Sequence, residues 1–148
     1  MLQSAIRLTR GVIEGMKARG WGRLIYITSI AVKQPLDDLI ISNTYRAGLT
    51  GFVKTISNTH ARHGITANTV CPGYTATDRL WHLAEKRAEA GGITPEEAMA
   101  QMGSGSPAGR VGKPEELAAV VAFLAGKPAA YVTGSAIVVD GGSYKGLL

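Results

Sequence analysis

Apolar side chains recur along the chain in two different spacings, which predict alternating helices and strands. Residues 2–18 place Ile6, Ile13 and Met16 among charged residues at helical intervals, and Gly20 is a typical residue for the end of such a helix. Short apolar runs are instead typical of strands that are buried on both faces of a parallel sheet. Three such strands are predicted, over residues 24–27, 65–70 and 136–139.

The remaining segments have the pattern or the start signals of helices. We predict helices over residues 42–60 and 78–90, and two more that begin near residues 94 and 114. Ser42 is the expected N-cap of the first of these. Thr94, Pro95 and Glu97 match a capping box with proline at the first helical position. The order of helices and strands predicts parallel strands that are joined by right-handed crossovers.

The composition is that of one core-forming domain. The 148 residues are 45% hydrophobic and 18% charged, and this length favours one domain over residues 1–148. No apolar run approaches the roughly 20 residues that cross a bilayer, so no membrane partner is expected. The single cysteine, Cys71, excludes an internal disulfide and agrees with a reducing compartment. We therefore expect a cytoplasmic protein.

The net charge of +5 does not indicate a nucleic-acid partner. The basic residues are scattered along the chain, whereas nucleic-acid sites gather them into runs or interleave them with stacking aromatic residues. The histidines His60, His63 and His82 lack the spacing of metal ligands with cysteine or carboxylate residues, so no metal site is predicted.

One strand and the helix after it carry a recognisable pattern. The predicted strand leads into Ser29, and the run Ala47-Gly48-Leu49 lies in the next helix. This pattern resembles the active-site half of the short-chain dehydrogenase/reductases, and is similar to the 3-oxoacyl-acyl-carrier-protein reductases among them. In that family a strand ends in a catalytic serine, and the next helix opens with Y-x-x-x-K and a small-small-Leu run. Further family signatures are resembled, in the same order, by residues 63–70, 71–77, 109–116 and 132–142.

The resemblance implies a catalytic centre in which two residues are replaced. Ser29 fills the serine position, but Ser42 stands in the tyrosine position and Arg46 in the lysine position. A serine hydroxyl has no ionisation that could be tuned for proton donation near neutral pH, and arginine keeps its charge. Tyr45 shares a helical face with Ser42, Arg46 and Leu49. It is either a substitute acid or a packing residue, and Ser29 is either a working catalyst or a retained polar residue.

The resemblance also implies NAD or NADP as the cofactor. Arg46 would hold the ribose, and Pro72, Gly73 and Thr77 resemble the turn that touches the nicotinamide and pyrophosphate. The same turn could equally be a strand exit that needs proline and glycine. Residues 78–108 resemble a helical insertion that closes over the substrate, a small-molecule or acyl carbonyl compound.

The resemblance leaves the nucleotide-binding half of the family's fold unmatched. Complete members begin with a strand, a glycine-rich turn and a helix that bind the pyrophosphate. The only fingerprint-like segment here, residues 103–108, follows a predicted helix and contains a proline, so we predict a loop. The predicted fold class is therefore α/β, the C-terminal part of a Rossmann-type doubly wound parallel sheet, with three strands and flanking helices.

An incomplete sheet has consequences for partners and function. The strand at residues 24–27 would keep a bare edge, and bare edges associate with other chains. We expect a homo-oligomer or a complex with a complementary N-terminal half. The expected function is that of an oxidoreductase lineage, inactive as this isolated chain. The alternative is a non-catalytic pseudoenzyme or oligomerisation subunit.

Overall fold

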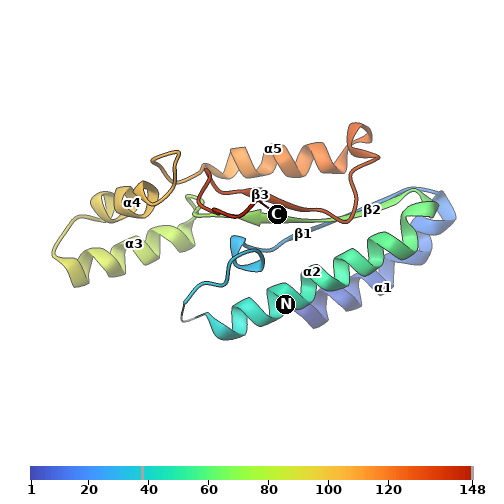
Figure 1. Ribbon diagram of the computed structural model, residues 1–148, viewed down its shortest axis with the longest axis horizontal. Helices are drawn as coiled ribbons and strands as arrows, with labels where there is room; N and C mark the ends of the chain where they lie inside the picture. Colours follow the sequence, from blue (N-terminus) through green and yellow to red (C-terminus); the bar gives the residue numbers. More distant parts are fainter. Residues whose placement is uncertain (38, 148) are drawn as a thin grey trace.

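The computed structural model describes residues 1–37 and 39–147, and it shows a three-stranded parallel sheet with helices on both faces (Figure 1). The elements are α1 (Leu2–Arg19), β1 (Gly22–Ile27), α2 (Ile40–His60), β2 (Ile65–Pro72), α3 (Asp78–Gly91), α4 (Pro95–Ser104), α5 (Pro114–Ala125) and β3 (Ala136–Val139). Short 3-10 turns follow β1, α2 and α5 at Ile30–Val32, Ala61–His63 and Lys127–Ala129. The predicted α/β class and the three predicted strands are confirmed.

The strands lie in the order β1-β2-β3, so β2 is central. Gly22 pairs with Ile65 and Ile27 with Val70, which means that β1 is paired with β2 along its whole length. Among the described residues no strand pairs with the other edge of β1. The bare edge that the sequence predicted is therefore present in this chain.

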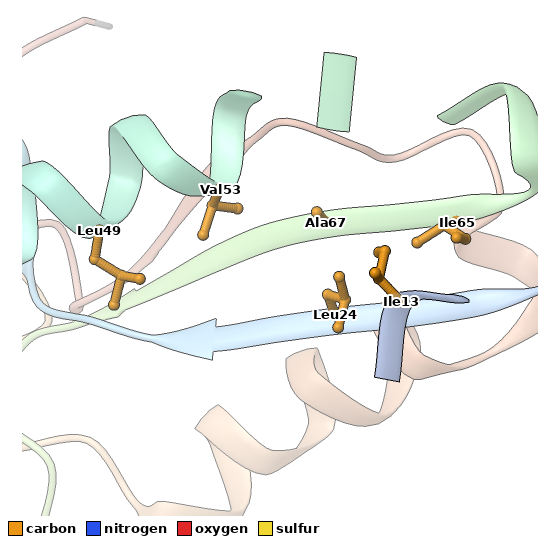
Figure 2. Packing of buried hydrophobic residues seen from close by; sticks show 6 residues of the cluster. All are labelled: Ile13, Leu24, Leu49, Val53, Ile65 and Ala67. Carbon is orange, nitrogen blue, oxygen red and sulfur yellow. The ribbon is translucent and has the colours of Figure 1, made fainter. Parts of the chain in front are cut away.

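The central strand separates two apolar layers, because successive side chains of a strand point to opposite faces. Ile65 and Ala67 pack against α1 and α2, together with Ile13, Leu24, Leu49 and Val53 (Figure 2). Val70 points to the other face, where Leu124 of α5 is completely buried. Burying apolar surface on both faces is what holds this small sheet together.

Asn68 ties the loop before β3 to the centre of the sheet. Its side chain is 1% exposed, its Nδ2 donates to the carbonyl of Val132 (2.8 Å), and its Oδ1 accepts from the backbone N–H of Ser135 (3.1 Å). Thr133 in the same loop accepts from the backbone N–H of Ala67 (3.0 Å). These bonds satisfy polar groups that the loop would otherwise bury unpaired.

Residues 78–108 include a helical hairpin that extends beyond the end of the sheet (Figure 1). Leu80, Ala84 and Ala88 of α3 pack against Ala98, Met99 and Met102 of α4. The predicted capping box is present, since Thr94 accepts from the N–H of Glu97 and the Glu97 carboxylate accepts from the N–H of Thr94. Residues 103–108 run from the end of α4 into turns and form no strand-turn-helix unit.

The start of α2 differs from the prediction. The helix begins at Ile40 with Leu39 as its N-cap, so Ser42 lies within the first turn and is not the N-cap. The physical reason is that the Ser42 hydroxyl bonds the side chain of Arg46 and caps no backbone N–H.

Within the described residues, no helix is both long and apolar enough to cross a membrane.

Candidate functional site

The candidate site lies at the end of β1, where the chain leaves the sheet. Ser29 follows the strand in extended conformation and caps the 3-10 turn Ile30–Val32, its Oγ accepting from the N–H of Ala31 (3.1 Å). The side chain is half-buried. Because the oxygen serves only as an acceptor in this bond, the hydroxyl hydrogen of Ser29 remains available to donate.

Arg46 brings the replaced residues to the end of β1. Its Nε donates to Ser42 Oγ at 3.0 Å, and its Nη1 donates to the backbone carbonyl of Thr28. Ser42 and Arg46 therefore do share one face of α2. The structure thus brings Ser42 and Arg46 of α2 close to the peptide that joins Thr28 to Ser29. Ser42 and Ser29 are 13 residues apart in the sequence.

The residue whose carbonyl Arg46 contacts is anchored to β2 by two hydrogen bonds. Thr28 is buried, its backbone N–H donates to the carbonyl of Val70 (2.8 Å), and its Oγ1 donates to the same carbonyl (3.1 Å). The Thr28 hydroxyl also lies 3.2 Å from the sulfur of Cys71, which is fully buried. Cys71 therefore forms part of the support beneath the site.

Tyr45 is not part of this network. Its side chain is 49% exposed, and its hydroxyl forms no hydrogen bond with any described residue. A substrate or cofactor would have to approach the exposed ring for it to act as an acid.

The turn after β2 is shaped by the exit of β3. A Cβ atom on Gly73 would lie 2.8 Å from Cβ and 2.9 Å from Cα of Asp140, so the missing side chain makes room for β3. The Gly73 N–H donates to the carbonyl of Val139 (3.0 Å). Pro72 ends β2, and Thr77 precedes α3 in extended conformation without a side-chain capping bond. This turn lies at the carboxyl ends of the strands, the edge that binds ligands in open α/β sheets.

A dinucleotide would find only part of its usual site among the described residues. Arg46 has unused N–H groups beside Ser29, which suits a ribose hydroxyl. No glycine-rich turn links a strand to a helix N-terminus in residues 1–37 and 39–147, so the pyrophosphate cradle of the fold is not supplied here. The described residues therefore offer hydrogen-bond donors that suit a ribose hydroxyl, but no cradle for the pyrophosphate.

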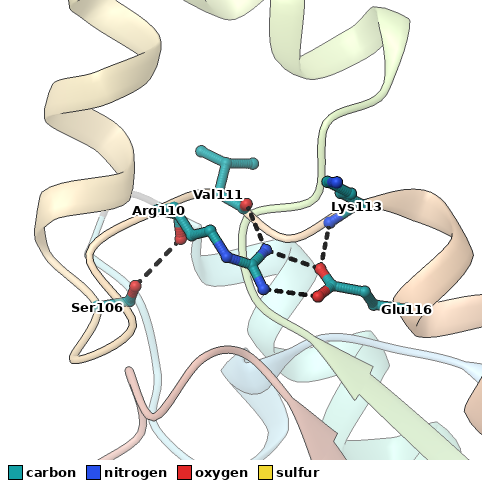
Figure 3. A network of polar contacts seen from close by, with 5 residues as sticks. All are labelled: Ser106, Arg110, Val111, Lys113 and Glu116. Carbon is teal, nitrogen blue, oxygen red and sulfur yellow. Dashed lines mark hydrogen bonds and ion pairs between the residues drawn. The ribbon is translucent and has the colours of Figure 1, made fainter.

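A second polar network, which the sequence did not reveal as a site, joins the loop after α4 to α5 (Figure 3). Arg110 contacts the Glu116 carboxylate through two nitrogens, at 2.6 and 2.8 Å, and the backbone N–H of Lys113 donates to the same carboxylate at 2.7 Å. The Arg110 hydrogen bonds, and then that of Lys113, lower the pKa of Glu116 to about 2. A small cavity of about 160 Å³ lies beside this network. In the sequence, the only signal of this network was Pro114-Glu115-Glu116, which marks the start of α5.

An apolar groove of about 430 Å³ runs along the bare edge of β1. Leu8 and Val12 of α1 and Ile25 and Ile27 of β1 contribute to its lining. Leu8 is 70% exposed and Ile27 is 48% exposed.

Among described residues, no group of histidine, cysteine and carboxylate side chains could hold a metal ion.

Comparison with known proteins finds one family along nearly the whole chain. The sequence profile described as enoyl-(acyl carrier protein) reductase matches residues 1–144. The NADPH-dependent reductase BacG of Bacillus subtilis is 39% identical over 132 residues, which are 89% of this chain and 51% of BacG. The 3-oxoacyl-[acyl-carrier-protein] reductase FabG of Vibrio cholerae is 36% identical over 143 residues, 97% of this chain and 54% of FabG.

A solved structure shows the same arrangement. The L-sorbose reductase of Gluconobacter frateurii, complexed with NADPH and L-sorbose, superposes with a TM-score of 0.94 at 34% identity. The match covers 99% of this chain and 56% of the sorbose reductase. The chain spans about half the length of the curated relatives it matches.

Proposed function

Because the chain belongs to the short-chain dehydrogenase/reductase family, we propose that it forms the substrate-side half of an NAD(P)-dependent oxidoreductase for a carbonyl compound or alcohol. The contact of Arg46 with Ser42 and with the carbonyl of Thr28 carries this proposal. It supports the assignment because it gathers the residues of the lysine and tyrosine positions beside Ser29, at the ligand-binding edge of the sheet.

Each of these residues has a role that its hydrogen bonds allow. Ser29 and Ser42 use their oxygens as acceptors within the protein, so both hydroxyl hydrogens can donate to a substrate oxygen. Arg46 can hold a ribose hydroxyl with its unused N–H groups. Pro72, Gly73 and Thr77 would border the nicotinamide, which supplies a hydride when it is bound in reduced form. The α3–α4 hairpin would close over the substrate.

The names of the relatives favour an acyl carbonyl substrate. FabG is a 3-oxoacyl-[acyl-carrier-protein] reductase, and other relatives of similar identity are acetoacetyl-CoA reductases. The apolar residues at the start of α2 agree with such a substrate, since Ile40 and Ile41 are 79% and 72% exposed directly before Ser42.

We further propose that residues 1–148 alone are inactive. The pyrophosphate cradle is not among the described residues, and the apolar groove along β1 needs a covering partner to exclude water. That partner would be a complementary N-terminal half, or another copy of the chain in a homo-oligomer. A non-catalytic pseudoenzyme or oligomerisation subunit is the second candidate, and the position of Tyr45 outside the Arg46 network favours it.

Measurements of cofactor binding and turnover test the proposed inactivity of the isolated chain and the proposed reductase activity separately. The 148-residue chain should show no micromolar affinity for NADH or NADPH in calorimetric titration. A fusion that adds the N-terminal half of FabG from Vibrio cholerae should bind one of them and should oxidise it when a carbonyl substrate is present. In that fusion Ser29→Ala should slow oxidation, whereas Thr59→Ala, which removes an exposed hydroxyl near the far end of α2, should not. Tight binding by the chain alone, or no turnover by a fusion that binds cofactor, would contradict the proposal.

A further inference from the structure

The C-terminal ends of α1 and α2 meet at one end of the sheet (Figure 1). The contact is close, because a Cβ atom on Gly64, which follows α2, would collide with the backbone of Gly20, which follows α1. His60 is the last residue of α2 and is half-buried at this junction. Its ring nitrogen Nδ1 is buried and has no hydrogen-bond partner among the described residues. Such an unpaired buried atom is uncommon in a folded protein.

The charged groups that face His60 come from α1 and from the 3-10 turn after α2. Lys17 and Glu14 of α1 form an ion pair with each other, with 2.7 Å between Lys17 Nζ and Glu14 Oε1. Arg62 and His63 face the ring from the turn, and the centroids of the two histidine rings are 6.3 Å apart. The one carboxylate of this group is therefore already engaged by a lysine, and no described carboxylate forms an ion pair with His60.

These surroundings favour a neutral imidazole over a charged one. A neutral ring with its hydrogen on Nε2 keeps only a lone pair at Nδ1, whereas a protonated ring buries an N–H there without an acceptor. Burial lowers the pKa of His60, and the charges of Lys17 and His63 lower it further. Glu14 acts in the opposite direction. The C-terminal end of a helix attracts a cation, but Lys17 and Arg62 already supply positive charge at this end.

We propose that His60 is a pH-dependent latch between α1 and α2, closed while the imidazole is neutral and loosened when it takes up a proton. In the unfolded chain a histidine takes up its proton near pH 6.5, roughly its ordinary pKa, whereas the folded junction resists protonation. The contribution of the latch to folding stability is therefore complete above about pH 6.5 and is lost as the pH falls below that value. No cofactor or substrate takes part, so the latch is independent of the proposed reductase function. Because α1 also lines the apolar groove along β1, the latch would make the shape of that groove depend on pH.

An NMR titration of the histidines in the 148-residue chain tests the protonation step. The midpoint of His60 should lie below about 6.5, the ordinary value. Lys17→Gln removes a facing cation and frees Glu14, so it should raise that midpoint. Arg7→Gln removes the same charge from an exposed position about 15 Å away along α1 and should leave the midpoint unchanged. A wild-type midpoint at or above the ordinary value would overturn the proposal, and so would equal midpoints in the wild type and Lys17→Gln.

Melting temperatures and hydrogen exchange test the latch itself. Between about pH 7.5 and 5.5 the melting temperature of the wild-type chain should fall, and His60→Gln, which takes up no proton, should reduce that fall. His82→Gln removes an exposed histidine from α3 and should keep the fall of the wild type. Over the same range, exchange protection should decrease more in the last turn of α1 than in α4, because the loosening is local.

Two results of these measurements would overturn the latch. One is an equal fall in melting temperature in the wild type and His60→Gln, and the other is an equal loss of protection in α1 and α4. If His60→Gln does not fold, the NMR titration of Lys17→Gln and the hydrogen exchange of the wild-type chain still decide the question.

Discussion

The hydrogen bonds of Asn68 should make it one of the most sensitive polar positions of the fold. Asn68→Ala removes two bonds and leaves the Val132 carbonyl and the Ser135 N–H unpaired. Each unpaired group costs about 1–2 kcal/mol, the lower part of the range for buried groups, because both residues are only half-buried. The expected loss of unfolding free energy is about 2–4 kcal/mol.

Thermal or urea unfolding measured by circular dichroism tests this value. For a chain of this size the loss corresponds to a fall in the melting temperature of roughly 5–15 °C. All variants must be compared at one protein concentration, since association changes apparent stability. Asn58→Ala, an exposed asparagine on α2, is the matched control and should change stability by less than about 0.5 kcal/mol. A loss at Asn68 no larger than that of the control would refute the reasoning.

Three other outcomes are expected. Gly73→Ala should lower the unfolding free energy by about 1–3 kcal/mol in a melting experiment, because its Cβ would collide with Asp140; an unchanged melting temperature would show that β3 moves aside. The lowered pKa of Glu116, about 2, means that its contribution to stability is complete above about pH 4.5 and is lost as the pH falls toward 2. Glu116→Gln should therefore flatten that part of the acid-unfolding curve, and an unaltered curve would remove Glu116 from the account. The 148-residue chain should self-associate through its exposed apolar surfaces, and a folded monomer at tens of micromolar in light scattering would count against this.

The sequence predicted the elements better than the contacts between them. The three strands and the capping box of α4 were predictable because apolar runs and start signals are local in the chain. The start of α2 was not, because Leu39, Ile40 and Ile41 carry no capping signal and the hydroxyl of Ser42 has another partner.

The residues of the candidate site were predicted from the family resemblance, whereas their geometry became visible only in the structure. The contact of Arg46 with the carbonyl of Thr28 joins residues 18 positions apart, and no local pattern encodes it. The sequence likewise placed Gly73 in a turn but could not show that Asp140, the residue after β3, approaches it. Long-range contacts of this kind arise only when the sheet has formed.

The central claim is that the chain carries a reductase site whose proton donor has been replaced, and single-turnover reduction in the FabG fusion tests it most directly. The wild-type fusion should reduce a saturated ketone slowly, and Ser42→Tyr with Arg46→Lys should raise that rate about a hundredfold or more, because the pair restores a tunable acid. Tyr45→Phe should have no effect. A wild-type fusion that is already fast on the ketone and is inactivated by Tyr45→Phe would contradict the claim and make Tyr45 the acid.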